Sequence, residues 1–367
     1  MFRGIFIANI FCLVLMLMSN LSPLANPVRF WPVALCGLIF PVLLAGTFCF
    51  FIFWLICDRK KAWVSFLSLC LSLPNIFASV GLNRPAFNDI KEGGDLRVVT
   101  WNVGLMNYTA IDSGTAIKNN LVILGELKTL NADVICLQEL FTGMAPNGHY
   151  NFIDSISRTM GYPYHFFSFD YPKFDKSFYS GSIIFSKFPI VDTARKQYEL
   201  PFAGSAIRAG ILVGKDTINV ITTRLQSFRF QNNEYRALQA IKHGKDSALA
   251  GSMNIIRKLK YGYGQRFAQV EIVRNMIAAQ QRPVIFTGDL NDVPTSYAYT
   301  QLKKGLQDAW LEKGAGIGKT FQFISPTLRI DYIFHSSYFS AQQTKRIITD
   351  ASDHNGLVTD LRLQKNR

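Results

Sequence analysis

Charged residues are missing from long parts of the first 82 residues. Three apolar stretches, at 5–24, 30–57 and 62–80, contain no Asp, Glu, Lys or Arg. Each supplies the roughly 20 apolar residues that a helix needs to cross a bilayer. Buried helices of a soluble domain would carry an outward polar face, which these stretches lack, so the sequence predicts three transmembrane helices. The segment 22–25 is a poor small-x-small cleavage site, which favours an uncleaved anchor over a signal peptide.

Basic residues are few on one side of the predicted spans and concentrated on the other. The run Asp-Arg-Lys-Lys at 58–61 lies between the second and third spans, on the same side as Arg3. The opposite side carries Arg29 in the first loop and Arg84 after the third span. The positive-inside rule then places the 58–61 loop in the cytoplasm. We therefore expect a multi-pass protein of the inner (cell) membrane whose soluble part is extracytoplasmic, that is, periplasmic.

The chain also lacks a disulfide framework, an internal repeat and a low-complexity tract. Five of its six cysteines lie in or beside the apolar stretches, and Cys136 lies in an apolar run typical of a buried strand. From about residue 91 onward, short apolar strands alternate with helical stretches. About 275 residues of this kind suit one α/β domain. The predicted organisation is a membrane anchor at 1–90 and a soluble domain at 91–367.

Polar side chains follow the apolar strands of the soluble part where those strands end. Such residues are Asn102, Glu139, Asp289, Asn291, Asp353 and His354. One such group could be an ordinary turn, because Gly, Asp and Asn are turn formers, but the same arrangement recurs along the chain. Strand ends at one edge of a sheet converge in space, and convergent acids, amides and a histidine suit a hard divalent cation such as Mg²⁺.

Asp331 differs from these residues because it lies inside an apolar strand, between Ile330 and Tyr332. A buried carboxylate without a partner costs several kcal/mol. We therefore expect Asp331 to have a cationic or hydrogen-bonding partner.

Five short motifs, in this order, resemble the endonuclease/exonuclease/phosphatase superfamily. They are TWNVG at 100–104, ICLQE at 135–139, GDLND at 288–292, RIDYIF at 329–334 and SDH at 352–354. The resemblance extends over 96–363 and is greatest to the membrane-anchored bacterial branch, within a group that includes deoxyribonucleases and neutral sphingomyelinases. It implies an α/β four-layer sandwich, with two packed β-sheets flanked by helices, and a hydrolase of phosphoric esters that uses Mg²⁺ or Mn²⁺.

The resemblance also implies a role for each matching residue. Glu139 is the implied direct metal ligand, with Asn102 beside it and Asp353 as a further metal or water contact. Asp289 orients or deprotonates the attacking water, and Asn291 donates to a phosphate oxygen. Phosphate ester hydrolysis needs such a cation and such a water in line with the leaving group.

His354 is the other implied catalytic residue. By the same resemblance it is held by Asp331, which fixes its tautomer and favours the imidazolium. Whether Asp289 or His354 acts as the base is left open by the sequence.

Arg224 departs from the pattern of the family. Many relatives carry His here, in the strand TTRLQS at 222–227, where it contacts the phosphate. Arginine can bind a phosphate oxygen pair bidentately, but it cannot donate a proton at neutral pH. Either the leaving group is stabilised otherwise or the substrate is different, for example more anionic. Gln226 is a second candidate for phosphate contact, and a plain polar residue at a strand end explains it equally well.

The region from Arg224 to Arg274 contains ten Lys or Arg and three Asp or Glu. A solvated helix face explains such a region, and so do phosphate contacts with nucleic acid. Tethering to a bilayer favours anionic headgroups at the interface instead. The sequence therefore favours a membrane-anchored, metal-dependent phosphoesterase that acts on a phosphodiester of phospholipid type. An extracytoplasmic nuclease is the alternative, and a catalytically inactive binding module of the same fold is a third hypothesis.

Overall fold

The structure is a computed structural model that divides into two compact units. The first comprises Met1–Val80, Ser227–Ala268 and Asp292–Gln301, and the second comprises Gly81–Gln226, Gln269–Asn291 and Leu302–Arg367. The described residues are 2–84, 86–108, 112–145, 148, 150–199, 204–230, 234, 248–323 and 325–364, with only the backbone described for 248–252. The predicted boundary at residue 90, between a membrane anchor and a soluble domain, stays a prediction. The first unit also takes in two segments from much later in the chain.

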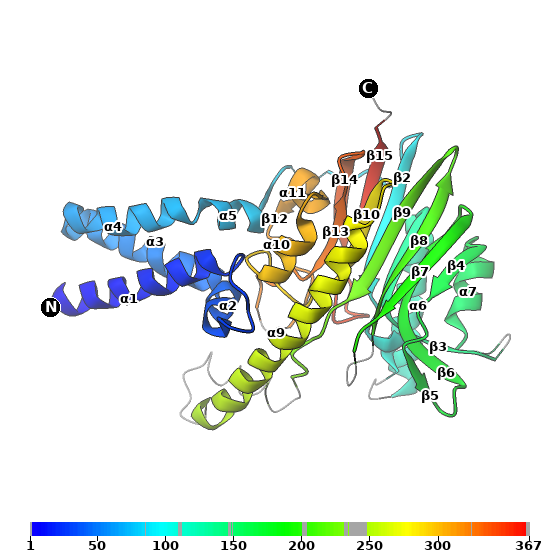
Figure 1. Ribbon diagram of the computed structural model, residues 1–367, viewed down its shortest axis with the longest axis horizontal. Coiled ribbons are helices and arrows are strands. Elements are labelled where there is room, and N and C mark those ends of the chain that lie inside the picture. The colour runs from blue at the N-terminus through cyan, green and yellow to red at the C-terminus, as the bar shows by residue number, and fades with distance from the viewer. Residues whose placement is uncertain are drawn as a thin grey trace. The chain divides into compact units, whose positions relative to one another are not determined.

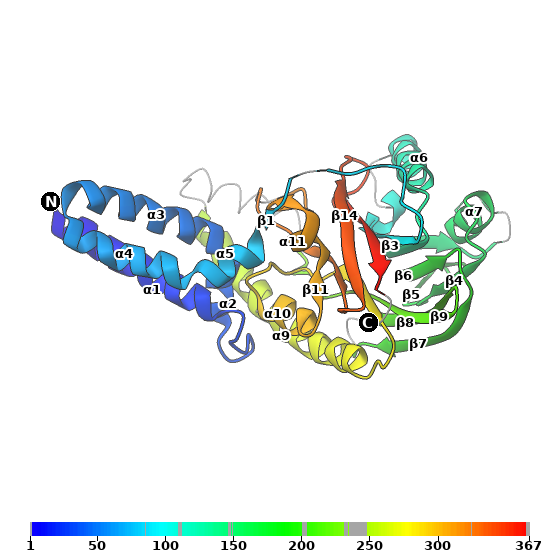
Figure 2. The same cartoon turned by 90° about the horizontal axis from the view of Figure 1, so that it is seen from above.

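The N-terminal helices form most of the first unit, and Figure 2 shows α1, α3 and α4 running side by side. Their bounds are α1 Phe2–Leu21, α2 Trp31–Leu38, α3 Phe40–Cys57, α4 Arg59–Leu71 and α5 Leu73–Ser79. Two of them, α1 and α3, are long and apolar enough to cross a membrane. The second predicted span is therefore shorter than its apolar stretch, because α2 and α3 are separate helices with a proline at the start of each.

The third predicted span is not a single helix. It consists of α4 and α5, which are bent by 49° at their junction. Pro74 lies in the first turn of α5, and a proline has no backbone N–H to continue the hydrogen bonds of the preceding helix. Three spans result only if this bent pair counts as one.

The long helix α9, Ala248–Ala278, contributes its N-terminal part to the first unit. There Ile255, Leu259 and Tyr263 pack with Ala34 of α2, and the Tyr263 hydroxyl donates to the Ala34 carbonyl at 3.2 Å. This part of the basic region thus packs against the apolar helices of its own unit. Residues 231–233 and 235–247 of the predicted basic region lie outside the described residues.

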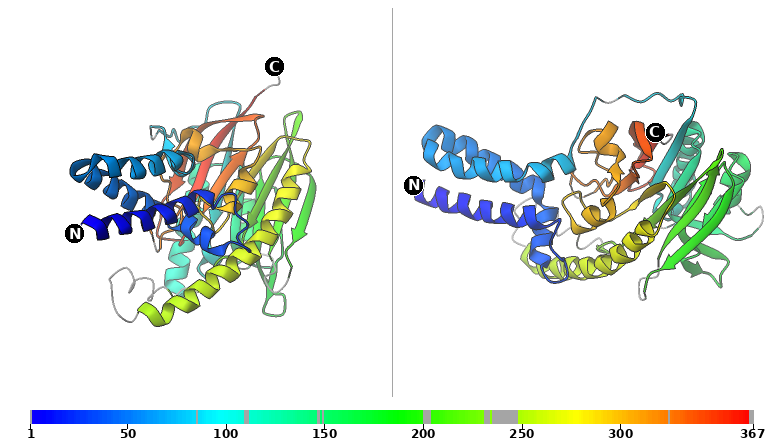
Figure 3. Two further views of the ribbon diagram at one scale, coloured as in Figure 1. Left: turned by 60° about the vertical axis from the view of Figure 1, so that its left-hand side comes forward. Right: turned by 45° about the horizontal axis from the view of Figure 1, so that its top comes forward.

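The second unit contains two mixed β-sheets packed face to face, and Figures 1 and 3 show their strands. One sheet has the order β14-β15-β2-β3-β6-β4, with β5 paired to β6. Its strands are β2 Asp95–Asn102, β3 Val134–Gly143, β4 Tyr164–Phe167, β5 Tyr171–Lys173, β6 Phe178–Ser186, β14 Phe339–Ile347 and β15 Gly356–Leu363. The other sheet has the order β11-β13-β10-β9-β8-β7. Its strands are β7 Ile190–Gln197, β8 Ser205–Val213, β9 Asp216–Arg224, β10 Val284–Asp289, β11 Gln307–Asp308 and β13 Asp331–His335.

Successive side chains on a strand point to opposite faces of its sheet, and this alternation builds the layers of the unit. On β2, Val98 points into the core between the sheets, whereas Val99 packs with the helices on the outer face, as the two-residue period of a strand requires. The outer helices of this sheet are α6 Ser113–Leu130 and α7 Phe152–Thr159. The remaining short elements are η1 Gly104–Asn107, α10 Tyr297–Lys303, α11 Ala309–Lys313 and the pair β1 Gly81–Leu82 with β12 Ala315–Gly316. The predicted four-layer sandwich is confirmed.

Strand register brings Arg224, Asp289 and Asp331 together at the ends of three neighbouring strands. Asp289, at the end of β10, pairs with Arg224 of the parallel strand β9. On its other side it pairs with Asp331 of the antiparallel strand β13. Gly288, one residue before Asp289, has φ +147°, and a Cβ there would lie 2.2 Å from the Thr223 carbonyl oxygen. Only glycine allows the two backbones to approach in this way.

We expect Gly288→Ala to destabilise the second unit by about 3 kcal/mol, because it combines backbone strain with a clash against β9. Hydrogen exchange of the β9 and β10 amides in the full-length protein measures the effect. Gly125→Ala is the matched control, because Gly125 lies in α6 with no atom within 4 Å of its Cβ position. That control should stabilise α6 by up to about 1 kcal/mol. Equal protection of β10 in Gly288→Ala and wild type would contradict this prediction.

Candidate active site

Asn102 links the ends of the two sheets. Its Nδ2 donates to Glu139 Oε1 at 3.1 Å and to Asp289 Oδ2 at 3.0 Å. Its Oδ1 accepts from the Gly104 backbone N–H at 3.1 Å. Asn102 and Glu139 belong to one sheet and Asp289 to the other, so this amide fixes the distance between two carboxylates of different layers.

Glu139 is aimed at the site by an irregularity in β3. The pairing of β3 with β6 shifts register between Leu137 and Leu140, and Glu139 has φ +54°. A left-handed conformation costs a non-glycine residue about 1–2 kcal/mol, and bulges of this kind re-aim a side chain. The cost is consistent with a functional position, where such strain concentrates.

Asn291 holds the carboxylate of Asp289 in place. Its backbone N–H donates to Asp289 Oδ1 at 2.8 Å, and its Nδ2 donates to Asp289 Oδ2 at 2.9 Å. Nδ2 also donates to the Leu225 carbonyl at 2.9 Å. Asn291 takes the left-handed conformation, φ +49°, which asparagine adopts more readily than most residues. The predicted phosphate donor is therefore, in this structure, a donor to Asp289.

His354 lies between two buried carboxylates. Its Nδ1 is 2.9 Å from Asp331 Oδ2, and its Nε2 is 3.9 Å from Asp289 Oδ2. All three side chains are buried. Burial alone would lower the pKa of His354, but the charges of Asp331 and Asp289 outweigh it and raise the pKa to about 10. At neutral pH this residue is an imidazolium, which donates hydrogen bonds from both nitrogens.

Burial raises the pKa of Asp289 to about 6, although the positive charge of His354 opposes the change. Asp289 is then ionised at neutral pH but binds a proton more readily than an exposed aspartate. In this arrangement Asp289 can accept a proton, whereas His354 already carries one.

Arg224 lies against the carboxylates of the site. Its Nε is 2.5 Å from Glu139 Oε1 and 3.8 Å from Asp289 Oδ2. The contact with Glu139 is an ion pair rather than an aligned hydrogen bond. Burial lowers the pKa of Arg224, but the charges of Glu139 and Asp289 outweigh it and the pKa is raised. The guanidinium thus supplies a permanent positive charge beside the implied metal ligand.

Asp353 and Gln226 lie at the edges of this cluster. Asp353 is exposed, and its Oδ1 is 3.2 Å from the position that a Cβ on Gly104 would take. Gln226 lies two residues beyond Arg224, where its backbone N–H donates to Gln269 Oε1 at 2.7 Å. Asp353 is therefore placed beside the turn that follows Asn102.

Two residues that sequence reasoning left without a role hold the His354 segment against β2. Ser352 Oγ donates to the Asn102 carbonyl at 2.8 Å and accepts from the His354 backbone N–H at 3.2 Å. Trp101 Nε1 donates to the His354 carbonyl at 2.9 Å. Both residues lie inside the sequence motifs given above, so their place in those motifs was the available signal. Neither side chain by itself suggests a catalytic or binding role.

The carboxylate oxygens of Glu139 and Asp289 suit a hard divalent cation, which prefers oxygen ligands. Asn102 presents its Nδ2 to both carboxylates and would bind an ion only if its amide turned to present Oδ1. A second set, Asp289, Asp331 and His354, has ligand atoms within 4.8 Å of one another. In that set the imidazolium charge of His354 opposes a cation, and its Nδ1 is already bonded to Asp331. Arg224 also places a positive charge on Glu139 of the first set, but without an aligned hydrogen bond. The first set is therefore a candidate for a metal only if Arg224 is displaced from Glu139.

A model described as the endonuclease/exonuclease/phosphatase family matches residues 99–354, a range that contains every residue of this cluster. The chain belongs to this family. The family name covers nucleases and phosphatases, both of which are hydrolases of phosphoesters. A second model, described as a domain of unknown function (DUF8431), matches residues 2–79. No curated protein matches the chain.

Several solved structures share this fold at low identity. An endonuclease/exonuclease/phosphatase protein from Beutenbergia cavernae is 22% identical, with TM-score 0.52, covering 73% of this chain and 72% of that one. The human Nocturnin catalytic domain with bound sulfate is 17% identical, with TM-score 0.51, covering 78% and 96%. ANGEL2, a 2',3'-cyclic phosphatase in complex with adenosine-2',3'-vanadate, is 16% identical, with TM-score 0.50, covering 73% and 96%.

We expect Asp331→Asn to lower the pKa of His354 from about 10 to below about 8, because the nearest negative charge is removed while burial remains. Imidazole NMR of the metal-free, full-length protein measures it. Glu312→Gln is the control, since Glu312 pairs with a different histidine, His335, at 3.2 Å, and should leave His354 unchanged. A His354 pKa that is the same in Asp331→Asn and wild type would exclude Asp331 as its cause.

Proposed function

We propose that the protein is a membrane-anchored phosphodiesterase that depends on Mg²⁺ or Mn²⁺. The observation that carries the proposal is the amide of Asn102 bridging Glu139 and Asp289 at 3.1 and 3.0 Å, with His354 Nε2 3.9 Å from the same Asp289 oxygen, Oδ2. Glu139 and Asn102 would hold the ion, with Asp353 as a further metal or water contact. When bound, the ion neutralises charge on the phosphoryl oxygens.

The protein's own side chains divide the remaining work. Asp289, kept in orientation by Asn291, accepts the proton of the attacking water. His354, held by Asp331, keeps its imidazolium N–H beside Asp289 and donates to a phosphoryl oxygen as negative charge develops there. Arg224 leaves Glu139 and binds the phosphate with its two parallel donors. Gln226 is a further candidate contact.

A phospholipid-type headgroup is the substrate that we favour. Two helices, α1 and α3, are long and apolar enough to cross a membrane, and α9 packs against α2 in the same unit. Arg257 and Lys260 are exposed on α9, and Tyr261 there is 49% exposed, a combination suited to an anionic headgroup surface. We place the catalytic unit on the periplasmic side of the inner membrane, from the basic residues at 59–61.

Hydrolysis by the full-length protein in lipid nanodiscs tests this function. The panel comprises phospholipid vesicles, single-stranded DNA and a small chromogenic phosphodiester, each with Mg²⁺, Mn²⁺ or EDTA. We expect hydrolysis of the small diester and the lipid, and its loss in EDTA. Glu139→Gln should reduce kcat/KM about 100-fold or more, because it removes the charge that holds the ion. Glu312→Gln is the same substitution outside the cluster and should keep full activity.

Activity that survives EDTA or Glu139→Gln would refute the metal-dependent mechanism. Hydrolysis of DNA without lipid would instead support the nuclease alternative. Absence of hydrolysis from all three substrates would leave the inactive binding module as the better account.

Arg224 should contribute to transition-state stabilisation. We expect Arg224→Ala to lose about 2–4 kcal/mol, by comparison with a removed oxyanion donor. Arg224→Lys should restore part of this transition-state stabilisation, because lysine carries a point charge without the planar fork of donors. Arg224→His should be most active at low pH, where the imidazolium is populated. Arg208→Ala is the control, since Arg208 on β8 pairs with Asp192. A loss of thermal stability in Arg224→Ala with kcat/KM within about twofold would assign Arg224 to folding alone.

A further inference from the structure

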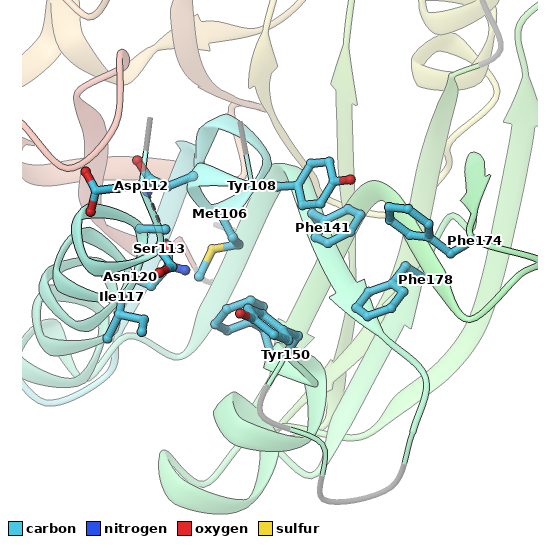
Figure 4. Close-up of a pocket in the computed structure, with 13 residues that line it drawn as sticks. Met106, Tyr108, Asp112, Ser113, Ile117, Asn120, Phe141, Tyr150, Phe174 and Phe178 are labelled. Carbon is cyan, nitrogen blue, oxygen red and sulfur yellow. Dashed lines mark hydrogen bonds between the residues drawn. The ribbon is translucent and has the colours of Figure 1, made fainter. Parts of the chain in front are cut away.

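A cavity of about 370 Å³ opens in the second unit beside η1 and α6. Figure 4 shows Tyr108, Phe141, Phe174 and Phe178 gathered on one side of it, with Met106 and Ile117 across from them. We call it the aromatic pocket. Ile117 and Phe174 are 55% and 58% exposed, so the pocket is open to solvent at its rim.

Two segments of the chain contribute residues both to the pocket and to the catalytic cluster. Phe141 follows Glu139 by two residues on β3, and Met106 lies in η1, which begins two residues after Asn102. The residues Gly104 to Asn107 all have positive φ, between +51° and +56°. This left-handed turn is fixed at its end, where Asn107 Nδ2 donates to the Ala351 carbonyl at 2.9 Å.

The described lining of the pocket does not favour a second anion site. None of the described residues that line the pocket is a Lys, Arg or His, and one, Asp112, is an acid. The amide of Asn107 is bonded within the fold, because Nδ2 donates to Asn120 and Oδ1 accepts from Asn119 at 3.0 Å. This amide is therefore not available to read the edge of a base.

The aromatic rings already contact one another. Phe141 stacks with Tyr108 at 4.3 Å between ring centroids and with Phe178 at 5.2 Å, and Phe141 is only 4% exposed. Phe174 meets Phe178 edge to face at 5.6 Å. Base recognition on aromatic residues needs an open ring face, which Phe141 lacks, although Tyr108 and Phe174 are about half exposed. An alkyl chain gains from any apolar surface that it covers.

We propose that the aromatic pocket binds an alkyl chain of the phosphodiester substrate, next to the phosphate. This inference rests on the proposed function and names the apolar part of its substrate. At about 370 Å³, the cavity has room for a chain of several carbons. Neutral alkyl groups match a lining whose described residues include no Lys, Arg or His, and the polar phosphate stays with Arg224 and the cluster.

A homologous series of soluble substrates tests the proposal in the full-length protein in nanodiscs. Methyl, butyl and hexyl 4-nitrophenyl phosphates are compared, with empty nanodiscs as a partition control. We expect kcat/KM to rise by up to about fourfold with each added methylene. Ile117→Trp, which fills the pocket, and Phe174→Ser, which removes part of its wall, should both flatten this rise. Leu121→Trp is the matched control, because Leu121 is 64% exposed on the next turn of α6 and does not line the pocket.

A chain-length rise that is absent in wild type, or equal in Ile117→Trp and wild type, would overturn the proposal. So would a thymidine 5'-(4-nitrophenyl) phosphate that is hydrolysed better than the hexyl ester and is impaired by Ile117→Trp, because a nucleobase would then occupy the pocket.

If no ester is hydrolysed, the proposed phosphodiesterase function fails, and binding of methylphosphonate and hexylphosphonate by calorimetry decides the pocket separately. If hexylphosphonate binds more tightly than methylphosphonate, and Ile117→Trp abolishes this difference, the pocket binds an alkyl chain. Equal binding of the two phosphonates overturns it.

Discussion

The burial of two like charges on neighbouring strands is the constraint on which this site depends. Asp289 and Asp331 are register partners on β10 and β13, and both are fully buried. Buried carboxylates of this kind are costly unless cations and hydrogen bonds compensate them. His354, between them, supplies one positive charge, and Arg224, on the next strand, supplies another. The ends of β9, β10 and β13 are therefore held together by charge as well as by backbone pairing.

The need to compensate these buried carboxylates also connects the two sheets. Asn102 reaches from one sheet to Asp289 of the other, and below it Gln138 donates to Thr222 across the interface at 2.9 Å. Ser352 and Trp101 then fix the segment that carries His354 to the end of β2. Because these polar groups bond to one another in a buried place, a change in sheet packing would displace the residues of the cluster. The fold and the chemistry are in this sense one network.

Much of the fold and of the cluster could be predicted from the sequence, because both follow short-range rules. Apolar strands with polar ends indicated a shared edge, and the register of β10 with β9 and β13 brings those ends together. The bulge that aims Glu139 could not be predicted, since a left-handed residue depends on the pairing of β3 with β6. Nor could the contact of Arg224 with Glu139, or the bend between α4 and α5 that interrupts the third apolar stretch. These depend on tertiary packing that an apolar pattern does not encode.

Arg224 lies against Glu139 in the structure, and the proposed mechanism moves it to the phosphate, with an ion held by Glu139 in its place. Anomalous diffraction from crystals of the full-length protein soaked in Mn²⁺ tests this directly. The account predicts an ion within about 2.5 Å of Glu139 and Asn102, with Arg224 Nε moved away from its present 2.5 Å contact with Glu139 Oε1. An ion held by Asp289, Asp331 and His354 instead, with Arg224 still on Glu139, would contradict it.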